Sequence, residues 1–151
     1  MTAIDKFFEI ANAKGRIDEA AVAEIYDQLD AIPSEGLVGS WKGTSLDTGH
    51  PAHERLLEVS WAGKDFHSID DVDPVIIYDD SGKRVVSEEF GKARIRQVIF
   101  RDVATASMVY DKLAIIDSFR RVTDDIVLGA MDSRDLNVHG TYYFYLTRNR
   151  D

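Results

Sequence analysis

The residue best placed to do chemistry in this sequence is Asp117, which lies in the apolar segment 113–122. A carboxylate among apolar neighbours must find a partner, or its pKa rises. Arg121 points to the same side of a strand but sits about 13 Å away at ~3.3 Å per residue. A cross-strand arginine, Arg94 or Arg96, is therefore the expected partner. A structural ion pair and a site for a ligand head group both remain open.

The four histidines are the other candidates for chemistry. His50 and His53 are three residues apart, so on a helix they would be neighbours and could contribute to a metal site, although helix capping or surface roles are the preferred interpretation. They lack the His-Glu-x-x-His zinc spacing. His139 precedes the last strand, as the iron ligand does in some haem-binding barrels. A histidine beside Asp117 would make an acid–base pair only if folding brings the two together. We expect no metal or cofactor.

The composition limits the partners of the chain. A net charge of −9 and a pI near 4.8 repel phosphate backbones, so nucleic-acid binding is not expected. The basic residues Lys92, Arg94, Arg96 and Arg101 are better explained as a solvated sheet edge. No apolar run approaches the ~20 residues that span a bilayer. Without a signal-like N-terminus or any cysteine, the expected location is the cytoplasm.

Two helices are predicted before residue 34. Thr2 and Asp5 form a capping-box pattern ahead of apolar residues at helical spacing. Asp18 is the expected cap of a second helix that ends by the segment 33–36. Both helices are amphipathic, so residues 1–34 are expected to pack on a barrel formed by residues 35–151, within one structural domain. The alternative is that these helices pair with a second copy of the chain, in a homodimer.

After residue 36 the apolar pattern alternates as in strands, interrupted by a short helix at 51–60 and an acidic loop at 70–73. The predicted strands are 37–46, 61–66, 75–78, 84–87, 93–100, 105–110, 113–122, 126–131 and 141–147. Short connectors between them imply antiparallel neighbours. The fold class is therefore mainly β: a small antiparallel barrel of about eight strands with an N-terminal helical pair.

Several motifs resemble one protein family. Gly39-Ser-Trp41-Lys-Gly43 and Trp61-Ala-Gly-Lys64-Asp-Phe66 resemble the GXWXG family. Ala106-Ser-Met108-Val-Tyr110-Asp and Leu128-Gly-Ala-Met131-Asp resemble the DUF4334 domain that accompanies it. The resemblance covers residue 37 to the C-terminus and implies no assigned activity. The glycine–tryptophan motif is also similar to the first strand of lipocalin-like barrels, which implies a carrier of apolar small molecules or lipids. The missing cysteine pair and signal peptide separate the chain from secreted lipocalins.

Trp41 shares a strand face with Gly39 and Gly43, where small neighbours make room for a ring that closes one end of the barrel. The lipocalin resemblance implies that Arg148 stacks on this ring. The strand 141–147 is apolar on both faces, so one face is expected to line the lumen and the other to lie under the helices.

The expected function is to bind a fatty acid, a phospholipid or a similar apolar molecule inside the barrel. The alternatives are a small enzyme that uses Asp117 and a histidine, although catalysis is the less expected outcome, and an interaction module. The predicted ligand-binding residues are Trp41, Trp61, Phe66, Arg94, Arg96, Met108, Tyr110, Asp117, Phe119, Arg121, Met131, Tyr143 and Tyr145.

Overall fold

The computed structural model describes residues 1–150 and contains three α-helices and ten strands. The helices are α1 (Ala3–Asn12), α2 (Glu19–Gln28) and α3 (Pro51–Glu58). The strands are β1 (Asp30–Ala31), β2 (Gly39–Ser45), β3 (Trp61–Ser68), β4 (Asp71–Tyr78), β5 (Arg84–Val86), β6 (Ala93–Phe100), β7 (Val103–Tyr110), β8 (Ile115–Thr123), β9 (Ile126–Ser133) and β10 (Tyr142–Arg148).

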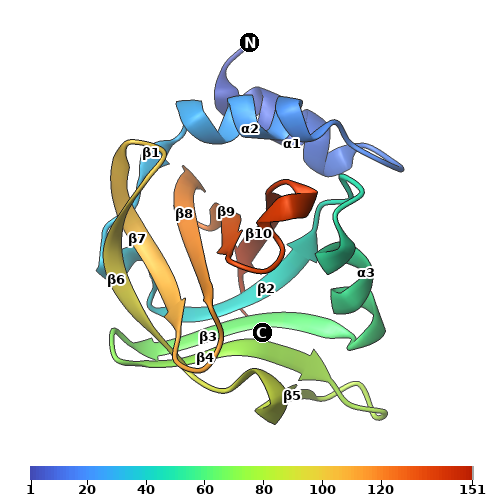
Figure 1. The fold of residues 1–151 in the computed structure, drawn as a ribbon, viewed down its shortest axis with the longest axis vertical. Helices are drawn as coiled ribbons and strands as arrows, with labels where there is room; N and C mark the ends of the chain where they lie inside the picture. The colour runs from blue at the N-terminus through green and yellow to red at the C-terminus, as the bar shows by residue number, and fades with distance from the viewer. Residues whose placement is uncertain (151) are drawn as a thin grey trace.

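The strands close into an antiparallel barrel (Figure 1). The ring runs β8-β7-β6-β4-β3-β2-β10-β9, and β9 pairs with β8 to complete it. β1 pairs with β8 and β5 pairs with β4, outside this ring of eight. The predicted class, a mainly β antiparallel barrel with an N-terminal helical pair, is confirmed.

The helical pair lies across one side of the barrel (Figure 1). α1 begins with the predicted capping box, because the side chains of Thr2 and Asp5 each accept the other's backbone N–H. Asp18 caps α2 by accepting the N–H of Ala20. α2 ends at Gln28, earlier than predicted, because the chain then forms β1. Dimerisation through these helices stays a hypothesis.

Arg120 of β8 lies beneath α2 and fixes its C-terminal end. Its Nη1 donates to the carbonyls of Tyr26 and Leu29, at 3.0 Å each, and the Tyr26 carbonyl also accepts the backbone N–H of Leu29, the C-cap residue. The guanidinium also lies 4.6 Å from the centre of the Tyr26 ring. The outward face of β8 therefore serves the helical layer and not the lumen.

Two apolar clusters occupy the two faces of the barrel wall. The inner cluster includes Phe66, Phe119 and Phe144, and the outer cluster joins the helices to residues such as Leu128 and Tyr143. β10 supplies both clusters, because its alternate side chains point to opposite faces.

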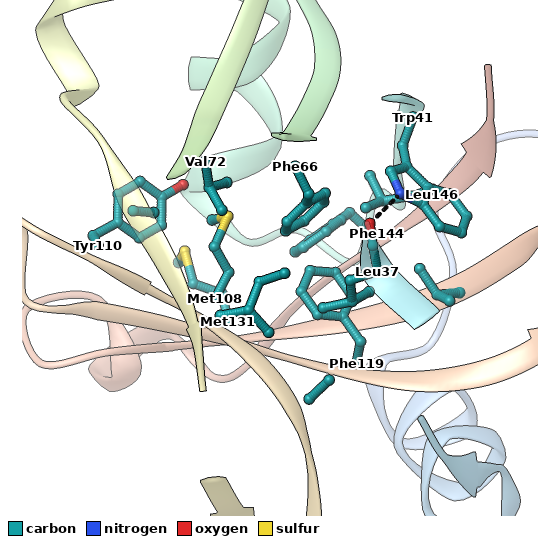
Figure 2. Close-up of a cluster of buried hydrophobic side chains, with 14 of the residues drawn as sticks. Leu37, Trp41, Phe66, Val72, Met108, Tyr110, Phe119, Met131, Phe144 and Leu146 are labelled. Atoms are coloured by element: carbon teal, nitrogen blue, oxygen red, sulfur yellow. Dashed lines mark hydrogen bonds between the residues drawn. The ribbon is translucent and has the colours of Figure 1, made fainter. Parts of the chain in front are cut away.

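Trp41 closes one end of the barrel. It is fully buried, and its Nε1 donates to the carbonyl of Leu37 at 2.8 Å. The Arg148 guanidinium stacks 4.2 Å from the centre of the Trp41 ring, so the predicted cation–π contact is confirmed. Figure 2 shows Trp41 and Leu146 at one end of the inner cluster and Tyr110 at the other.

The prediction that the motif glycines make room for the Trp41 ring was wrong. They make room for other groups. A Cβ on Gly43 would lie 2.4 Å from the Trp61 ring, and one on Gly39 would lie 2.8 Å from Arg148 Nη1. Gly63 of β3 is the tightest position, since its Cβ would lie 1.9 Å from the Trp41 carbonyl oxygen. Glycine is required where the two strands approach this closely.

The acidic segment 70–73 is not a loop throughout, because β4 begins at Asp71. Lys92 neutralises this stretch: its Nζ lies 2.6 Å from carboxylate oxygens of both Asp71 and Asp73. Pro74, which lacks an N–H, is tolerated in β4 because the pairing of β4 with β6 is confined to Val72.

We expect Gly63→Ala to destabilise the protein much more than Gly82→Ala. Both glycines have positive φ, +153° and +84°, but nothing lies within 4 Å of a Cβ at Gly82. Gly82→Ala should cost about 1 kcal/mol of left-handed backbone strain, and Gly63→Ala about 3 kcal/mol or more because an overlap is added. Urea unfolding measures both. Equal losses of unfolding free energy in the two variants would show that the close approach of β2 and β3 does not require glycine at position 63.

Candidate functional site

A cavity of about 240 Å³ lies inside the barrel, at the end covered by α3. β2 runs from Trp41 at the closed end to Ser45, just before α3, so the cavity and the Trp41 plug lie at opposite ends. The cavity wall is mostly apolar. Its apolar lining includes Ala52, Leu56, Trp61, Ile115, Met131 and Phe144.

The polar part of the cavity is a buried ion pair between Lys64 and Asp117. Lys64 Nζ lies 3.3 Å from Asp117 Oδ2, and the two residues are 3% and 2% exposed. Lys64 comes from β3 and Asp117 from β8, which are opposite each other in the ring, so the pair crosses the lumen. Lys64 Nζ also donates to the Pro74 carbonyl at 2.9 Å.

One atom of this pair has no partner. Asp117 Oδ1 is buried and makes no hydrogen bond to any of residues 1–150, while Asp117 lines the cavity. A buried carboxylate oxygen without a hydrogen bond costs free energy that a suitable donor would recover. The cavity wall therefore contains a residue with an unsatisfied acceptor atom.

Three aromatic rings surround the ammonium of Lys64. Nζ lies 5.2 Å from the ring centre of Phe144, 5.6 Å from that of Trp61 and 5.7 Å from that of Tyr110. Such ring faces attract a cation most strongly where water is excluded. The Tyr110 hydroxyl, at 3.5 Å, is at the limit of a hydrogen bond to the same nitrogen.

Burial shifts the protonation of both partners toward their neutral forms. Desolvation lowers the pKa of Lys64, and the nearby Asp117 carboxylate opposes this shift. Desolvation likewise raises the pKa of Asp117, opposed by Lys64. Burial also raises the pKa of the Tyr110 hydroxyl well above its ordinary value. Burial therefore favours the neutral form of each partner, and the charge of the other partner opposes it.

The helix that covers the cavity is held by two histidines. His50 caps α3, because its Nδ1 accepts the N–H of Ala52 at 3.0 Å. His53 Nδ1 lies 2.6 Å from Ser45 Oγ, which accepts the hydroxyl of the cavity residue Tyr142 at 2.5 Å. Each Nδ1 thus serves a different contact, and His50 takes the capping role that was the preferred interpretation of this pair.

Four of the thirteen predicted ligand-binding residues line the cavity: Trp61, Tyr110, Asp117 and Met131. Four others, Trp41, Phe66, Met108 and Phe119, belong to the inner cluster that fills the rest of the lumen and are not among the cavity lining.

The three predicted arginines do not face the cavity. Salt bridges join Arg94 to Asp111 at 3.1 Å, Arg96 to Asp70 at 2.8 Å and Arg121 to Asp124 at 2.7 Å. All three arginine side chains are more than 40% exposed. The expectation that Arg94 or Arg96 pairs with Asp117 was wrong, because alternation along β6 points both side chains away from the lumen.

Tyr143 and Tyr145 were assigned to the wrong face of β10. Tyr143 lies in the outer cluster, where its hydroxyl accepts from Arg101 Nη1 at 2.7 Å, and Tyr145 packs edge-on against Phe7 of α1. Their neighbours Tyr142 and Phe144 line the cavity instead. Both faces of this strand are apolar, so the sequence did not reveal which one points inward.

The main residue that the sequence analysis missed is Lys64. A lysine is usually exposed, and its burial is the exception. The available signal was its position between Ala62 and Phe66 on one face of β3, a face that is otherwise apolar. The partner of Asp117 is thus a lysine and not a histidine.

Comparisons with known proteins agree with this architecture. The sequence model described as "GXWXG protein" matches residues 24–82, and the "Domain of unknown function (DUF4334)" matches residues 91–148. A crystal structure of a protein from Thermomonospora curvata is 39% identical, with a TM-score of 0.92, over 99% of this chain and 100% of that one. The chain belongs to the GXWXG/DUF4334 family. No curated protein matches it.

The family motif Gly39-Ser-Trp-Lys-Gly43 thus lies at the closed end, while the cavity draws on both matched segments. Lys64 falls within the GXWXG match and Asp117 within the DUF4334 match. In this GXWXG/DUF4334 protein, none of the helices in residues 1–150 has the length and apolar character required to cross a bilayer.

We expect Lys64→Met to destabilise this GXWXG/DUF4334 protein by about 3–5 kcal/mol, because it leaves the Asp117 carboxylate buried without a counter-ion. The double variant Lys64→Met/Asp117→Leu should recover most of this loss, since a well-packed apolar pair replaces a buried ion pair at little net cost. Free energies of unfolding from urea titration form the double-mutant cycle. Additive losses in the double variant would show that the two side chains are not coupled.

We expect the stability to fall as the pH drops below about 6.5, partly through His50. Burial lowers the pKa of His50, so the unfolded chain binds a proton there that the folded chain resists. The contribution of His50 to the stability is complete above the pKa that this residue has in the unfolded chain. It decreases as the pH falls toward the lower pKa of His50 in the folded protein.

The control for this prediction is His50→Asn, which keeps an N-cap acceptor without a titrating group. Urea midpoints between pH 5 and pH 8 should fall less steeply with acid in this variant than in the wild type. If the two curves stay parallel, His50 does not contribute to the pH dependence.

Proposed function

We propose that this protein binds a small apolar molecule in the barrel cavity, with one polar group of that molecule at the Lys64–Asp117 pair. The observation that carries the proposal is an apolar cavity that contains a buried ion pair with one unpartnered carboxylate oxygen. Ligand sites commonly combine an apolar wall with a few convergent polar groups. The barrel would then work as lipocalin-like barrels do, and we place it in the cytoplasm because the sequence has no cysteine.

The cavity volume supports a compact ligand. A cavity of about 150 Å³ lined by apolar side chains accommodates benzene. On that scale 240 Å³ holds a molecule of about ten non-hydrogen atoms. An aromatic ring system or a short acyl chain fits this volume, whereas a whole phospholipid would have to extend beyond it.

The polar contacts favour a ligand that donates a hydrogen bond. The Lys64 ammonium already has acceptors in the Pro74 carbonyl and in Asp117 Oδ2, so it offers little to a further acceptor. Asp117 Oδ1 requires a donor such as an alcohol, a phenol or an amide. A carboxylate ligand would instead meet the negative charge of Asp117, and the arginines predicted to balance it lie on the surface.

We expect 2-naphthol to bind to the purified wild-type protein with saturation and one-to-one stoichiometry. Naphthalene, which lacks the hydroxyl donor, should bind about tenfold more weakly, the equivalent of about 1.4 kcal/mol for one hydrogen bond to a charged group. 2-Naphthoate should bind more weakly still. Isothermal titration calorimetry, with quenching of naphthol fluorescence as a second readout, measures all three.

Ala52→Phe is the variant designed to block binding. Ala52 lies in α3 against the cavity, so a phenyl ring at this position occupies the volume proposed for the ligand. Leu57→Phe is the control, since Leu57 is on the same helix but is 62% exposed and absent from this cavity lining. Binding should be lost in the first variant and kept in the second. The proposal is overturned if none of the three probes binds to the wild type.

A further inference from the structure

We propose that Lys64 forms a Schiff base with small apolar aldehydes or ketones that enter the cavity. This inference rests on the proposed function, because it requires the cavity to admit apolar molecules, and it adds a covalent bond to one ligand class. Lys64 is the one lysine among the described residues that lines the cavity. Desolvated lysines in apolar pockets are the type of amine that condenses with carbonyl compounds.

The nucleophile in this reaction is the neutral amine, and Asp117 is placed to produce it. Lys64 Nζ lies 3.3 Å from Asp117 Oδ2, so one proton can pass from the ammonium to the carboxylate. Burial favours this transfer from both sides, since it lowers the pKa of Lys64 and raises that of Asp117.

Other titratable groups around the cavity do not compete for this proton. Tyr110 and Tyr142 are held neutral, because burial raises the pKa of both hydroxyls. The charged group that α3 contributes, Arg55, has its own salt bridge to Glu89 at 2.5 Å. The proton is therefore exchanged between Lys64 and Asp117 alone.

The reaction balances without an oxidant or a reductant. The Nζ lone pair attacks the carbonyl carbon, a C–N bond forms, and the carbonyl oxygen takes the proton held by Asp117 to give a carbinolamine. One of the two N–H protons of this adduct then returns to Asp117. The C–O bond breaks as the hydroxyl group takes that proton and leaves as water, and the nitrogen lone pair forms the C=N bond. The products are a protonated imine at Lys64, one water molecule and the Asp117 carboxylate.

The same surroundings that hold the ammonium stabilise the product. The protonated imine keeps the positive charge, which faces the Asp117 carboxylate and the rings of Trp61, Tyr110 and Phe144. The substituent of the carbonyl compound extends into the apolar part of the cavity, away from the ion pair. A structural ion pair in a filled core would offer no such space, and here both partners line a cavity of about 240 Å³.

The test is reductive trapping on the wild-type protein. We incubate the protein at pH 7 with a low concentration of cinnamaldehyde and sodium cyanoborohydride, which converts an imine into a stable secondary amine. Intact mass should increase by one aldehyde less its oxygen, and peptide mapping should place the adduct on Lys64. The six other lysines of the chain are the internal reference, and Lys64 should react at least tenfold faster than any of them.

Cinnamyl alcohol separates failure of this inference from failure of the proposed function. It has the same carbon skeleton but no carbonyl group, so it binds without forming an imine and should slow the labelling of Lys64 alone. If cinnamyl alcohol binds but Lys64 stays unmodified, the Schiff base is excluded and the binding function stands. If cinnamyl alcohol does not bind and Lys64 stays unmodified, both proposals are overturned.

Asp117→Asn tests the role of the carboxylate. Asparagine has nearly the same shape but can neither accept the proton nor balance the charge of the imine. The labelling rate of Lys64 should fall at least tenfold relative to the other lysines of the same molecules, in a sample whose circular dichroism matches the wild type. An unchanged ratio would exclude Asp117 from the reaction. Lys64→Met/Asp117→Leu should lose the cavity adduct and keep the slow surface labelling.

Discussion

An ammonium group and a carboxylate that leave water together each lose several kcal/mol of hydration free energy, which they recover only at short range and in the right geometry. In this barrel the two groups come from strands that are four steps apart in either direction around the ring. The contact of Lys64 with Asp117 therefore fixes the spacing of opposite walls, which no backbone hydrogen bond can do. The aromatic rings around Lys64 and the carbonyl of Pro74 complete this arrangement.

The lumen has one filled end and one end with a cavity, because the side chains that point into it differ in size along the barrel axis. At one end Trp41 and the phenylalanines fill the space, with Arg148 stacked over the indole. At the other end the ion pair crosses the lumen, and a cavity of about 240 Å³ lies beside it, against α3. The motif glycines contribute through contact distances: Gly39 makes room for Arg148 at the closed end, and Gly43 makes room for the ring of the cavity residue Trp61.

Local patterns in the sequence predicted the elements well, because capping residues, alternation and turn residues act within a few positions. The capping box at Thr2, the helix after Pro51 and the hairpin of β4 and β5 all follow from such signals. The site was predicted in part: Asp117 stood out as a polar residue in an apolar strand. Its partner Lys64 did not stand out, because β3 and β8 face each other across the lumen only once the ring of strands has closed. Similarly, the inward face of β10 is decided by where α1 and α2 pack, and not by Tyr143 or Tyr145 themselves.

His50 caps the helix that lies against the cavity, and this helix bears on how fast a ligand would leave. Trp41 blocks the far end, and the eight-residue helix α3, which starts at Pro51, lies against the cavity. Under the proposed function, a ligand would place its polar group at the ion pair and its tail against α3, so its residence time would depend on how often that helix moves. Release would then proceed at a rate set by one short helix, largely independent of the stability of the barrel as a whole.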